Sequence, residues 1–565
     1  MIKFFSKNSV IFLSFLILAL PAALKLILPG FYEPHDLHHF ADIYEMYRAF
    51  TSGQFPPRLG PDFLYNFGYP LFNFYYVLPF YLGALFLKLF GSIQLAYKLV
   101  FLSCIVTGIY GMYLLLREFT GKLAAFVGTV VFLYTPYRAV QIYVRGAMGE
   151  ALSLALTPLI AYALIKVVKN PGRLKQIAVA GLTGAIFILA HNFMWALTLP
   201  WIIILALIFA EKKTFWKSLW SLVGSGVLML GISAYWWVPA IIEQKLVAAV
   251  TPFPLIDHFP FIKQLIIPSW GYGPSITGPY DGLSFQIGIV NLIGVGIAFV
   301  AILFLKKIFK EKKLYWIGIW GLTTFFVMFF MMNIRSYPIW KILPFHDFIQ
   351  FPWRLLSLTT FLTAILIATV VELFRNKLKF IIAFSLMFGA IILTFNYFQP
   401  SHTTYKTDNE YLSRFFANRA MLGVKDSISI DYLNYSEDYL LLPKTDDKKP
   451  DFLPTEKIIS DKGKVQEIKE ISPIKWTSKV ISEKANKITF YGLNFPGWYA
   501  SVDGLEVDIH PAKPYGQIEI DVPSGSHEVA FNWKETPLRR GADLASILFL
   551  IASLAFVFKA KRVTI

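Results

Sequence analysis

The sequence is poor in charge and almost free of cysteine. Only 16% of its 565 residues are charged, whereas soluble domains carry about 25%, so an ordinary soluble enzyme is excluded. A disordered chain is excluded as well, because 56% of the residues are apolar and 17% are aromatic. The single cysteine, Cys104, excludes intramolecular disulfides and cysteine-rich metal sites. No Walker loop, Rossmann glycine fingerprint or Ser-His-Asp pattern is present, so nucleotide-driven chemistry is not expected.

The positive charge of the chain lies between apolar segments. Residues 1–400 carry 31 Lys and Arg against 14 Asp and Glu, an excess equal to the net charge of +17, whereas residues 401–540 carry 19 and 21. Basic residues in short loops between apolar segments mark the cytoplasmic side of a membrane protein. The charge pattern therefore predicts a lipid bilayer as partner and no nucleic acid.

Thirteen apolar segments are candidates for membrane spans, each of which needs about 20 residues. They are 9–29, 72–91, 94–116, 122–137, 148–168, 174–191, 195–211, 217–240, 285–305, 314–334, 355–374, 378–396 and 542–559. The distribution of basic loops requires one segment not to cross. We assign this role to 72–91, which is aromatic-rich, contains Pro79 and Gly83 and suits an interfacial or re-entrant helix; the segment 122–137 is the second choice. The prediction is an α-helical polytopic protein of the plasma membrane with about twelve spans and both termini in the cytoplasm.

The hydrophilic stretch 397–541 is long enough to form a domain outside the membrane. Asp503-Gly504 between two short β-rich segments is a strong hairpin signal. We expect a mostly antiparallel sandwich or jelly-roll-like fold with strands at 486–493, 498–502, 505–510, 517–522 and 527–533. The mixed composition of 401–485 predicts no definite structure. The chain then divides into a transmembrane domain at 1–396, this β-rich domain at 397–541, which we expect on the extracytoplasmic side, and a last span with a basic cytoplasmic tail at 542–565.

The first outer loop, 30–71, holds the densest group of acids and histidines. Pro34 followed by Asp36 predicts a helix of about 15 residues that begins here, with Asp36 and His39 on one face. One interpretation is that Asp36 only caps this helix. Another is that Asp36 is a general base at the membrane surface, with His39 as its hydrogen-bond partner. A third places a divalent metal ion on His35, Asp36 and His39, although nothing obvious supplies a further ligand.

A second group lies around the start of the segment 148–168. Arg138, Arg145 and Glu150 are costly in lipid when isolated, so we expect them to face a cavity or one another. Two guanidinium groups near a carboxylate suit a phosphate-bearing lipid; arginines that merely extend to the interface are the alternative. Weaker candidates at the end of another loop are His346, Asp347 and Arg354.

Several motifs resemble a known superfamily. The runs are His35-Asp-Leu-His-His39, Ser52-Gly-Gln-Phe-Pro-Pro-Arg58, Asn66-Phe-Gly-Tyr-Pro-Leu-Phe-Asn-Phe-Tyr75, Tyr143-Val-Arg-Gly-Ala-Met-Gly-Glu150 and Asn494-Phe-Pro-Gly-Trp-Tyr-Ala-Ser-Val-Asp-Gly504. The loop motifs resemble the first outer loop of GT-C glycosyltransferases. More narrowly, the chain resembles bacterial membrane proteins labelled 6-pyruvoyl-tetrahydropterin-synthase-related, which are close to the YfhO-like group. The pterin part of that label finds no support, because no three-histidine zinc site can be found.

The resemblance implies an inverting transferase that moves a sugar from a polyprenyl-phosphate carrier to an outward-facing glycan, lipid or protein acceptor. It implies that Asp36 is the catalytic carboxylate of the first loop, which takes the proton of the acceptor, and that Glu150 is the second acidic residue; His39 and Glu150 would orient the site. The superfamily's Asp/Glu-x-Asp signature is replaced by Glu33-Pro-His-Asp36, which leaves the role of Glu33 and the need for a metal open. The predicted substrate-binding residues are His35, Arg138, Arg145, His346, Asp347 and Arg354.

Two further functions remain open. One is a lipid-linked glycan transporter or flippase, and the other is a non-catalytic envelope glycan assembly protein. A transporter needs ionisable residues in mid-span, whereas the charges here lie near segment ends. The enzyme hypothesis requires a pocket on the outer leaflet bordered by Asp36 and Arg145.

Overall fold

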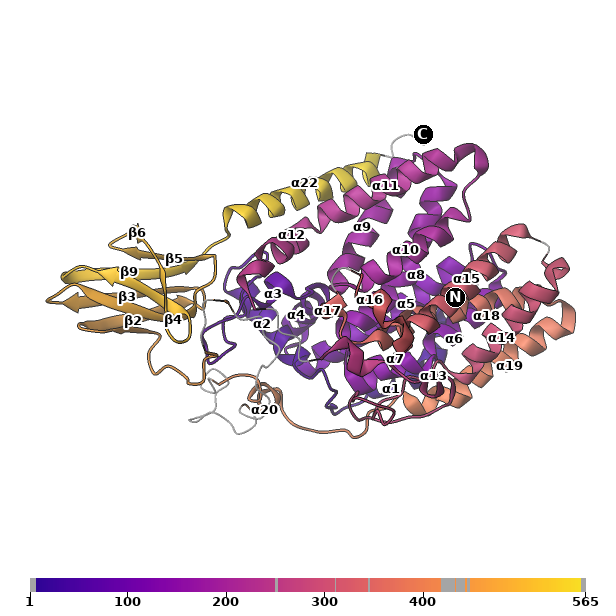
Figure 1. The fold of residues 1–565 in the computed structure, drawn as a ribbon, viewed down its shortest axis with the longest axis horizontal. Coiled ribbons are helices and arrows are strands. Elements are labelled where there is room, and N and C mark those ends of the chain that lie inside the picture. The colour runs from indigo at the N-terminus through magenta and orange to yellow at the C-terminus, as the bar shows by residue number, and fades with distance from the viewer. Residues whose placement is uncertain are drawn as a thin grey trace, which may run out of the picture.

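A computed structural model describes residues 7–248, 253–309, 311–343, 346–417, 432, 443–444 and 448–559. Helices form the larger body of the molecule, and β-strands form a smaller body at one end (Figure 1). The last helix, α22 (Pro537–Lys559), starts beside the strands and runs back along the helical body. The predicted arrangement, a helical body with a β-rich domain before its last helix, is confirmed.

Each of the thirteen apolar segments contains a helix. Besides α22 these are α1 (Lys7–Ile27), α4 (Leu78–Phe90), α5 (Ile93–Leu116), α6 (Lys122–Leu133), α8 (Met148–Lys169), α9 (Leu174–Ala190), α10 (Met194–Leu207), α11 (Phe215–Ile232), α14 (Ile289–Phe304), α15 (Lys312–Met331), α18 (Leu356–Leu373) and α19 (Asn376–Thr394). Seven spans in the described part of the chain are long and apolar enough to cross a membrane, or eight if α6 is joined to its continuation Pro136–Arg145, which is bent by 46°. Five others are shorter apolar helices, so the number of twelve crossings stays a prediction.

Short helices and turns connect these elements. They are α2 (His39–Thr51), α3 (Leu71–Phe74), α7 (Pro136–Ala139), η1 (Val140–Arg145), η2 (Lys212–Thr214), α12 (Ala234–Glu243), η3 (Gln244–Leu246), η4 (Leu255–His258), α13 (Ile262–Ile266), η5 (Lys306–Ile308), η6 (Ile334–Ser336), α16 (Tyr337–Trp340), α17 (His346–Ile349), η7 (Pro352–Leu355), η8 (Phe395–Tyr397) and α20 (Asp408–Leu412). Among them η1 is a π-helical turn, a rare geometry that often occurs at functional sites.

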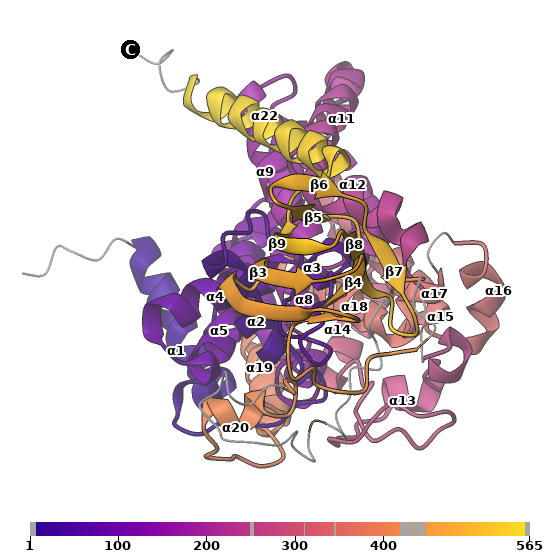
Figure 2. The ribbon, with the colours of Figure 1, turned by 90° about the vertical axis from the view of Figure 1, so that its left-hand side faces the viewer.

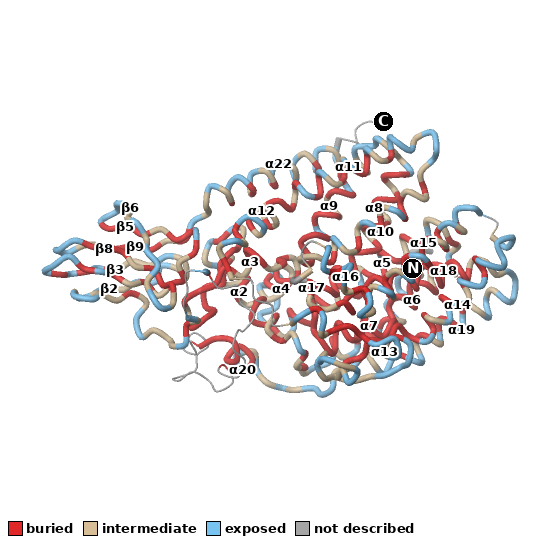
Figure 3. The backbone as a smooth tube through the Cα atoms, viewed as in Figure 1, coloured by how far each residue is buried: buried red, intermediate tan, exposed pale blue. Residues whose placement is uncertain are grey.

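The interior of the helical body is formed around α8 and α18. In the apolar stretches of these two helices, 83% and 94% of the residues are buried, whereas in those of α19 and α22 the shares are 28% and 17%. Figure 3 shows the same contrast between the inner and the outer helices. Large apolar side chains such as Ile392 and Leu548 are exposed on these two outer helices. Apolar faces of this kind suit contact with lipid rather than with water.

The strands form two antiparallel sheets, with the orders β1-β4-β8-β7 and β2-β3-β9-β5-β6. Their bounds are β1 (Ile458–Ser460), β2 (Lys464–Ser472), β3 (Lys475–Ser482), β4 (Asn486–Leu493), β5 (Trp498–Val502), β6 (Leu505–Val507), β7 (His510–Ala512), β8 (Gln517–Val522) and β9 (Gly525–Trp533). Phe490 of one sheet stacks on Phe531 of the other, with ring centroids 4.6 Å apart, in a shared apolar core. The predicted strand 505–510 is divided, because the chain passes from one sheet to the other between β6 and β7. The strands β1 to β3 lie in the stretch of mixed composition.

Buried ion pairs join the β-sandwich end of the molecule to the helices. Arg58 of the first loop pairs with Glu535 at 3.2 Å and with Asp543 of α22 at 2.9 Å. Arg539 of α22 pairs with Glu243 of α12 at 2.9 Å. Figure 2 views the molecule from this end, with the strands in front of the helices. The first loop, α12 and α22 are therefore held together beneath the sandwich.

Candidate active site

The first loop reaches the interior of the molecule at η1. The backbone N–H of Asp36 donates to the carbonyl of Arg145 at 2.7 Å. Gly146 follows with φ +68°, and a Cβ at this position would lie 2.6 Å from Pro34. Because only glycine permits this approach, the loop lies directly against the end of η1.

This contact brings Asp36 and Arg145 together. The Oδ2 atom of Asp36 lies 3.8 Å from Nη2 of Arg145, and the Asp36 side chain is 31% exposed. Burial alone would raise the pKa of Asp36, but the guanidinium of Arg145, together with the neighbouring histidines, holds it below its ordinary value. The carboxylate is therefore ionised at neutral pH and accessible to water.

Glu150, in the first turn of α8, anchors the guanidinium groups. Its Oε2 atom lies 2.6 Å from Nη1 of Arg145 and 3.7 Å from Nε of Arg354. Its Oε1 atom accepts hydrogen bonds from Tyr137, Gln141 and Ser357 at 2.5, 3.1 and 2.9 Å. Both oxygens are thus occupied, and Glu150 is placed to position two arginines rather than to exchange a proton.

Aromatic rings cover the two arginines. The guanidinium of Arg145 lies 4.6 Å from the ring centroid of Trp353, and that of Arg354 lies 5.2 Å from the centroid of Phe193. Arg354 also donates to the carbonyl of Ile349 at 2.7 Å. Because such surroundings contain little water, the charges act there more strongly than they would at an open surface.

The helix after the loop starts later than predicted. It begins at His39, with His38 at the N-cap, and Asp36 lies in the preceding turn. The predictions that Asp36 caps the helix and that it shares a helical face with His39 are therefore wrong. The physical reason is the hydrogen bond between the Asp36 N–H and Arg145, which holds the loop in a turn until residue 38.

The His39 ring is held by groups other than the Asp36 carboxylate. Its Nδ1 atom lies 3.0 Å from the carbonyl of Gly146, and its Nε2 atom lies 2.9 Å and 3.2 Å from the hydroxyls of Tyr76 and Tyr75. A carbonyl only accepts, so the network assigns the proton to Nδ1 and makes Nε2 an acceptor. Burial lowers the pKa of His39 to about 3, so the ring is neutral at neutral pH. The predicted hydrogen bond between Asp36 and His39 is wrong.

The predicted metal ligands His35, Asp36 and His39 do not converge. The Nε2 atom of His35 lies 2.8 Å from the carbonyl of Tyr272, in the connection between α13 and α14. The Nε2 atom of His35 is thereby directed to the backbone rather than to Asp36 or His39.

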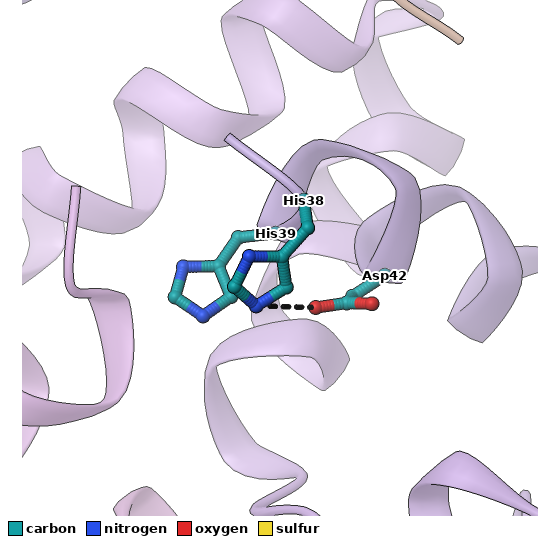
Figure 4. A group of neighbouring side chains, drawn as sticks. All are labelled: His38, His39 and Asp42. Carbon is teal, nitrogen blue, oxygen red and sulfur yellow. Dashed lines mark ion pairs between the residues drawn. The ribbon is translucent and has the colours of Figure 1, made fainter. Parts of the chain in front are cut away.

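Another group of possible metal ligands lies one residue further along. Within the described residues, the donor atoms of His38, His39 and Asp42 lie within 4.8 Å of one another, and Figure 4 shows His38 and Asp42 as an ion pair, which is 3.8 Å long. Two imidazoles and a carboxylate form a donor set that zinc accepts. His39 would, however, have to exchange its Tyr76 hydroxyl for the ion, because Nδ1 is bonded to Gly146.

Arg138, another predicted site residue, has its contacts outside this group. The guanidinium of Arg138 lies 4.8 Å from the ring centroid of Phe132 and within 3.5 Å of the position of a Cβ on Gly108, inside the helical body. The structure therefore does not bring it to Arg145. His346 lies in α17, and the side chain of Asp347 lies outside the described residues.

Glu33 forms ion pairs with two basic residues that follow the transmembrane domain. It pairs with Lys406 and Arg414, each at 3.0 Å. Although burial opposes it, these bonds lower the pKa of Glu33. The pairs attach the segment before and after α20 to the first loop.

Sequence reasoning missed the aromatic residues that surround His39. Tyr75 and Tyr76 come from the run that we interpreted as part of an interfacial helix, but they precede α4. His191 stacks on Tyr76 with ring centroids 5.1 Å apart. A Cβ on Gly149 would lie 2.5 Å from the Tyr76 ring, so this glycine makes room for it. The tyrosine pair and the His191-Asn192 corner were the signals in the sequence.

Two clefts in the described part of the chain lie elsewhere. One, of about 390 Å³, is at the C-terminal end of α2, beside the β-sandwich. The other, of about 150 Å³, lies between α14 and α19. Neither is lined by Asp36 or Arg145. The pocket that the enzyme hypothesis requires at Asp36 and Arg145 therefore stays a prediction, and access to Asp36 rests on its partly exposed carboxylate.

Comparison with known proteins gives one family and several distant structures. The model of a family described as "6-pyruvoyl-tetrahydropterin synthase related domain; membrane protein" matches residues 72–401. No curated protein matches the chain. Similar solved structures include arabinofuranosyltransferase AftD from Mycobacteria (12% identity, 70% of this chain and 27% of that chain, TM-score 0.44). ArnT from Cupriavidus metallidurans bound to undecaprenyl phosphate (12%, 69% and 64%, 0.42) and the Archaeoglobus fulgidus oligosaccharyltransferase (15%, 80% and 62%, 0.45) are also similar. The matches span less than two thirds of each of these proteins.

Proposed function

The chain belongs to the family of membrane proteins described as 6-pyruvoyl-tetrahydropterin synthase related, and we propose that it is a glycosyltransferase. It transfers a sugar from a polyprenyl-phosphate donor to an acceptor hydroxyl, with inversion at the sugar carbon. We place the first loop and the β-sandwich on the outer side of the plasma membrane and both termini in the cytoplasm. The basic loops between the apolar segments support this orientation.

One observation carries the proposal. An ionised carboxylate, Asp36, is accessible to water and lies 3.8 Å from the guanidinium of Arg145. The buried Glu150 holds this guanidinium in position through an ion pair of 2.6 Å. The structure gives Nη2 of Arg145 no hydrogen bond among the residues that it describes. Its N–H groups are therefore available to an anionic ligand beside a base, which is the pairing that glycosyl transfer from a lipid phosphate requires.

The reaction follows from this pairing. The acceptor oxygen attacks the anomeric carbon of the donor while Asp36 takes the hydroxyl proton. The bond between that carbon and the phosphate oxygen breaks, and the phosphate leaves with the electron pair. Arg145 stabilises the negative charge that develops on the leaving oxygen, with Arg354 next to it. Attack from the face opposite the leaving group inverts the anomeric configuration.

Replacement of Asp36 tests the proposal. We expect Asp36→Asn to lower the transfer rate by about 10²–10⁴-fold, the usual contribution of a general base. The full-length protein in nanodiscs is incubated with a panel of polyprenyl-phosphate-linked hexoses and pentoses and a mixture of neutral oligosaccharides. Release of free polyprenyl phosphate and labelled glycan product are both measured.

The matched control is Asp257→Asn, an acid of the connection before α13 for which no catalytic part is proposed. This variant should keep the rate of the unmodified protein. Normal transfer by Asp36→Asn, with the protein folded, would show that Asp36 is not the base.

A further inference from the structure

The cleft of about 390 Å³ lies between the first loop and the β-sandwich. The first loop contributes Arg48, Asp62 and Asn66, and the sandwich contributes its lining from the stretch before β1 and from β2 and β3. A volume of this size is typical of a small-molecule site. The cleft is thus built from two parts of the chain that are remote in sequence.

Several polar groups in the cleft have spare hydrogen-bonding capacity. The side-chain oxygen of Asn66 is buried and has no hydrogen-bond partner among the described residues. The side chain of Glu470 forms no ion pair or hydrogen bond within the same residues, whereas that of Asp62 is held by Arg48 at 2.9 Å. Lys457 donates to the backbone carbonyl of Asn66. A buried amide oxygen without a partner is costly, but this atom has almost no accessible surface. The exposed carboxylate of Glu470 is therefore the acceptor that ligand hydroxyls can reach directly.

An aromatic ring stands beside these polar groups. Trp476 of β3 is half-buried, and its indole N–H donates to the carbonyl of Pro473 at 3.2 Å. Phe490 packs next to it with ring centroids 6.4 Å apart. The indole is therefore fixed in place and lines the cleft. The Nζ atom of Lys457 lies over the indole, 5.8 Å from the ring centroid. The half-buried ring and the donors and acceptors around it match a sugar ring, which has an apolar C–H face and hydroxyls at its edge.

The strand at the cleft is irregular. The pairing of β2 with β3 shifts in register between Gln466 and Lys469, and again between Glu470 and Ser472. Bulges of this kind at sheet edges redirect side chains and are common beside binding sites. Both Ile468 and Glu470 of this bulged stretch line the cleft.

The charges in the cleft nearly cancel. Arg48 and Lys457 are opposed by Asp62, Glu456 and Glu470. Burial lowers the pKa of Lys457 to about 8, so the positive charge in the cleft is partly lost near that pH. A cleft without excess positive charge does not favour a phosphorylated or uronate-containing ligand, since such a ligand needs cationic partners.

We propose that this cleft binds a neutral oligosaccharide, which is the acceptor of the transfer reaction; the acceptor role rests on the proposed function. Arg48 and His39 lie at opposite ends of the same helix, α2, nine residues or about 14 Å apart at 1.5 Å per residue. An acceptor held in the cleft therefore needs several sugar units to bring its terminal hydroxyl to Asp36.

Glycan binding tests the proposal without requiring any reaction. The full-length protein in nanodiscs, labelled with a fluorophore, is applied to an array of neutral, uronate-containing and sulfated oligosaccharides. We expect binding to neutral oligosaccharides, weakened at least tenfold in both Trp476→Ala and Glu470→Gln. Glu470→Gln conserves shape at an exposed position, so its effect does not depend on the packing that Trp476→Ala alters.

Two further variants serve as controls for the binding measurement. Tyr499→Ala removes an aromatic ring from the opposite face of the same sheet, since Ala500 and not Tyr499 is level with Phe531 and Trp476, and it should bind normally. Asp36→Asn should also bind normally. Normal binding by both cleft variants, or binding of the unmodified protein only to anionic glycans or to none, overturns the cleft proposal. An active Asp36→Asn variant whose binding is normal contradicts only the proposed base.

Discussion

One neighbour, Arg145, decides the protonation state of the Asp36 carboxylate. Burial and the guanidinium of Arg145 act in opposite directions on its pKa, and the attraction of Arg145 prevails. His39 is neutral for a separate reason, which is burial, and its proton is fixed by the Gly146 carbonyl. The base and its neighbouring ring thus keep constant charge states across the neutral pH range.

The pH dependence of transfer follows from these shifts. A general base is active when the pH is above its pKa. Because the pKa of Asp36 lies below the ordinary value of about 3.9, the carboxylate stays ionised at neutral and weakly acidic pH. We expect kcat/KM to be level from pH 8 to pH 5 and to fall only at lower pH. In Arg145→Gln, burial is no longer outweighed, so the pH of this fall should rise. The exposed Arg335→Gln serves as control, and an unchanged profile in Arg145→Gln would contradict the assigned pair.

At the scale of elements, Glu150 joins three parts of the site. It belongs to α8 and contacts η1 through Arg145, η7 through Arg354, and the first turn of α18 through Ser357. A charge pair of this kind is favourable only while both signs are present, because each charge has been removed from water. The predicted proximity of Arg145 and Glu150 agrees with the structure, whereas Arg138 lies elsewhere.

Removal of this carboxylate should loosen all three elements. We expect Glu150→Gln to lower the free energy of unfolding by about 3–5 kcal/mol, since two buried guanidinium groups lose their counter-charge. Thermal unfolding in detergent measures the effect. Glu372→Gln breaks a half-buried pair with Lys379 and should cost about 1 kcal/mol or less. Equal stability of the two variants would show that Glu150 does not anchor the arginines.

At the scale of the whole molecule, the sandwich is attached through Arg58. This side chain is 1% exposed and holds Glu535 and Asp543 at the start of the last helix. The same loop forms one wall of the cleft of about 390 Å³, and α2 connects this part of the loop to Asp36. The attachment therefore sets the position of the sandwich relative to the candidate active site.

Loss of the Arg58 contacts should release this attachment. In Arg58→Met, two carboxylates lose their partner, and we expect faster amide hydrogen exchange in residues 535–545 and 54–60. Exchange in β4 and β8, inside the sandwich, should not change. The control is Arg540→Met, which removes an exposed arginine from the same helix. Unaltered exchange in Arg58→Met would contradict the proposed attachment.

Local sequence patterns determined the elements of this protein. The thirteen apolar segments became helices, because a run of apolar residues in lipid must satisfy its backbone hydrogen bonds internally. Strands such as β4 and β8 have the predicted bounds, since alternation and turn residues act over a few positions. The strands β1 to β3 were not predicted, for different reasons. β1 has only three residues, and β2 is largely exposed and irregular in register. In β3 two of the three buried residues are serines, so its buried face is not marked by apolar residues.

Tertiary structure alone decided which groups meet. The sequence indicated Asp36 and Arg145 as candidates, but only the contact between the first loop and η1 placed them together and moved the helix start to His39. The partners of His39 and the two walls of the cleft are likewise distant in sequence. Local patterns cannot encode such pairs, because a hydrogen bond or an ion pair depends on distance in space, and that distance is fixed by the packing of the whole chain.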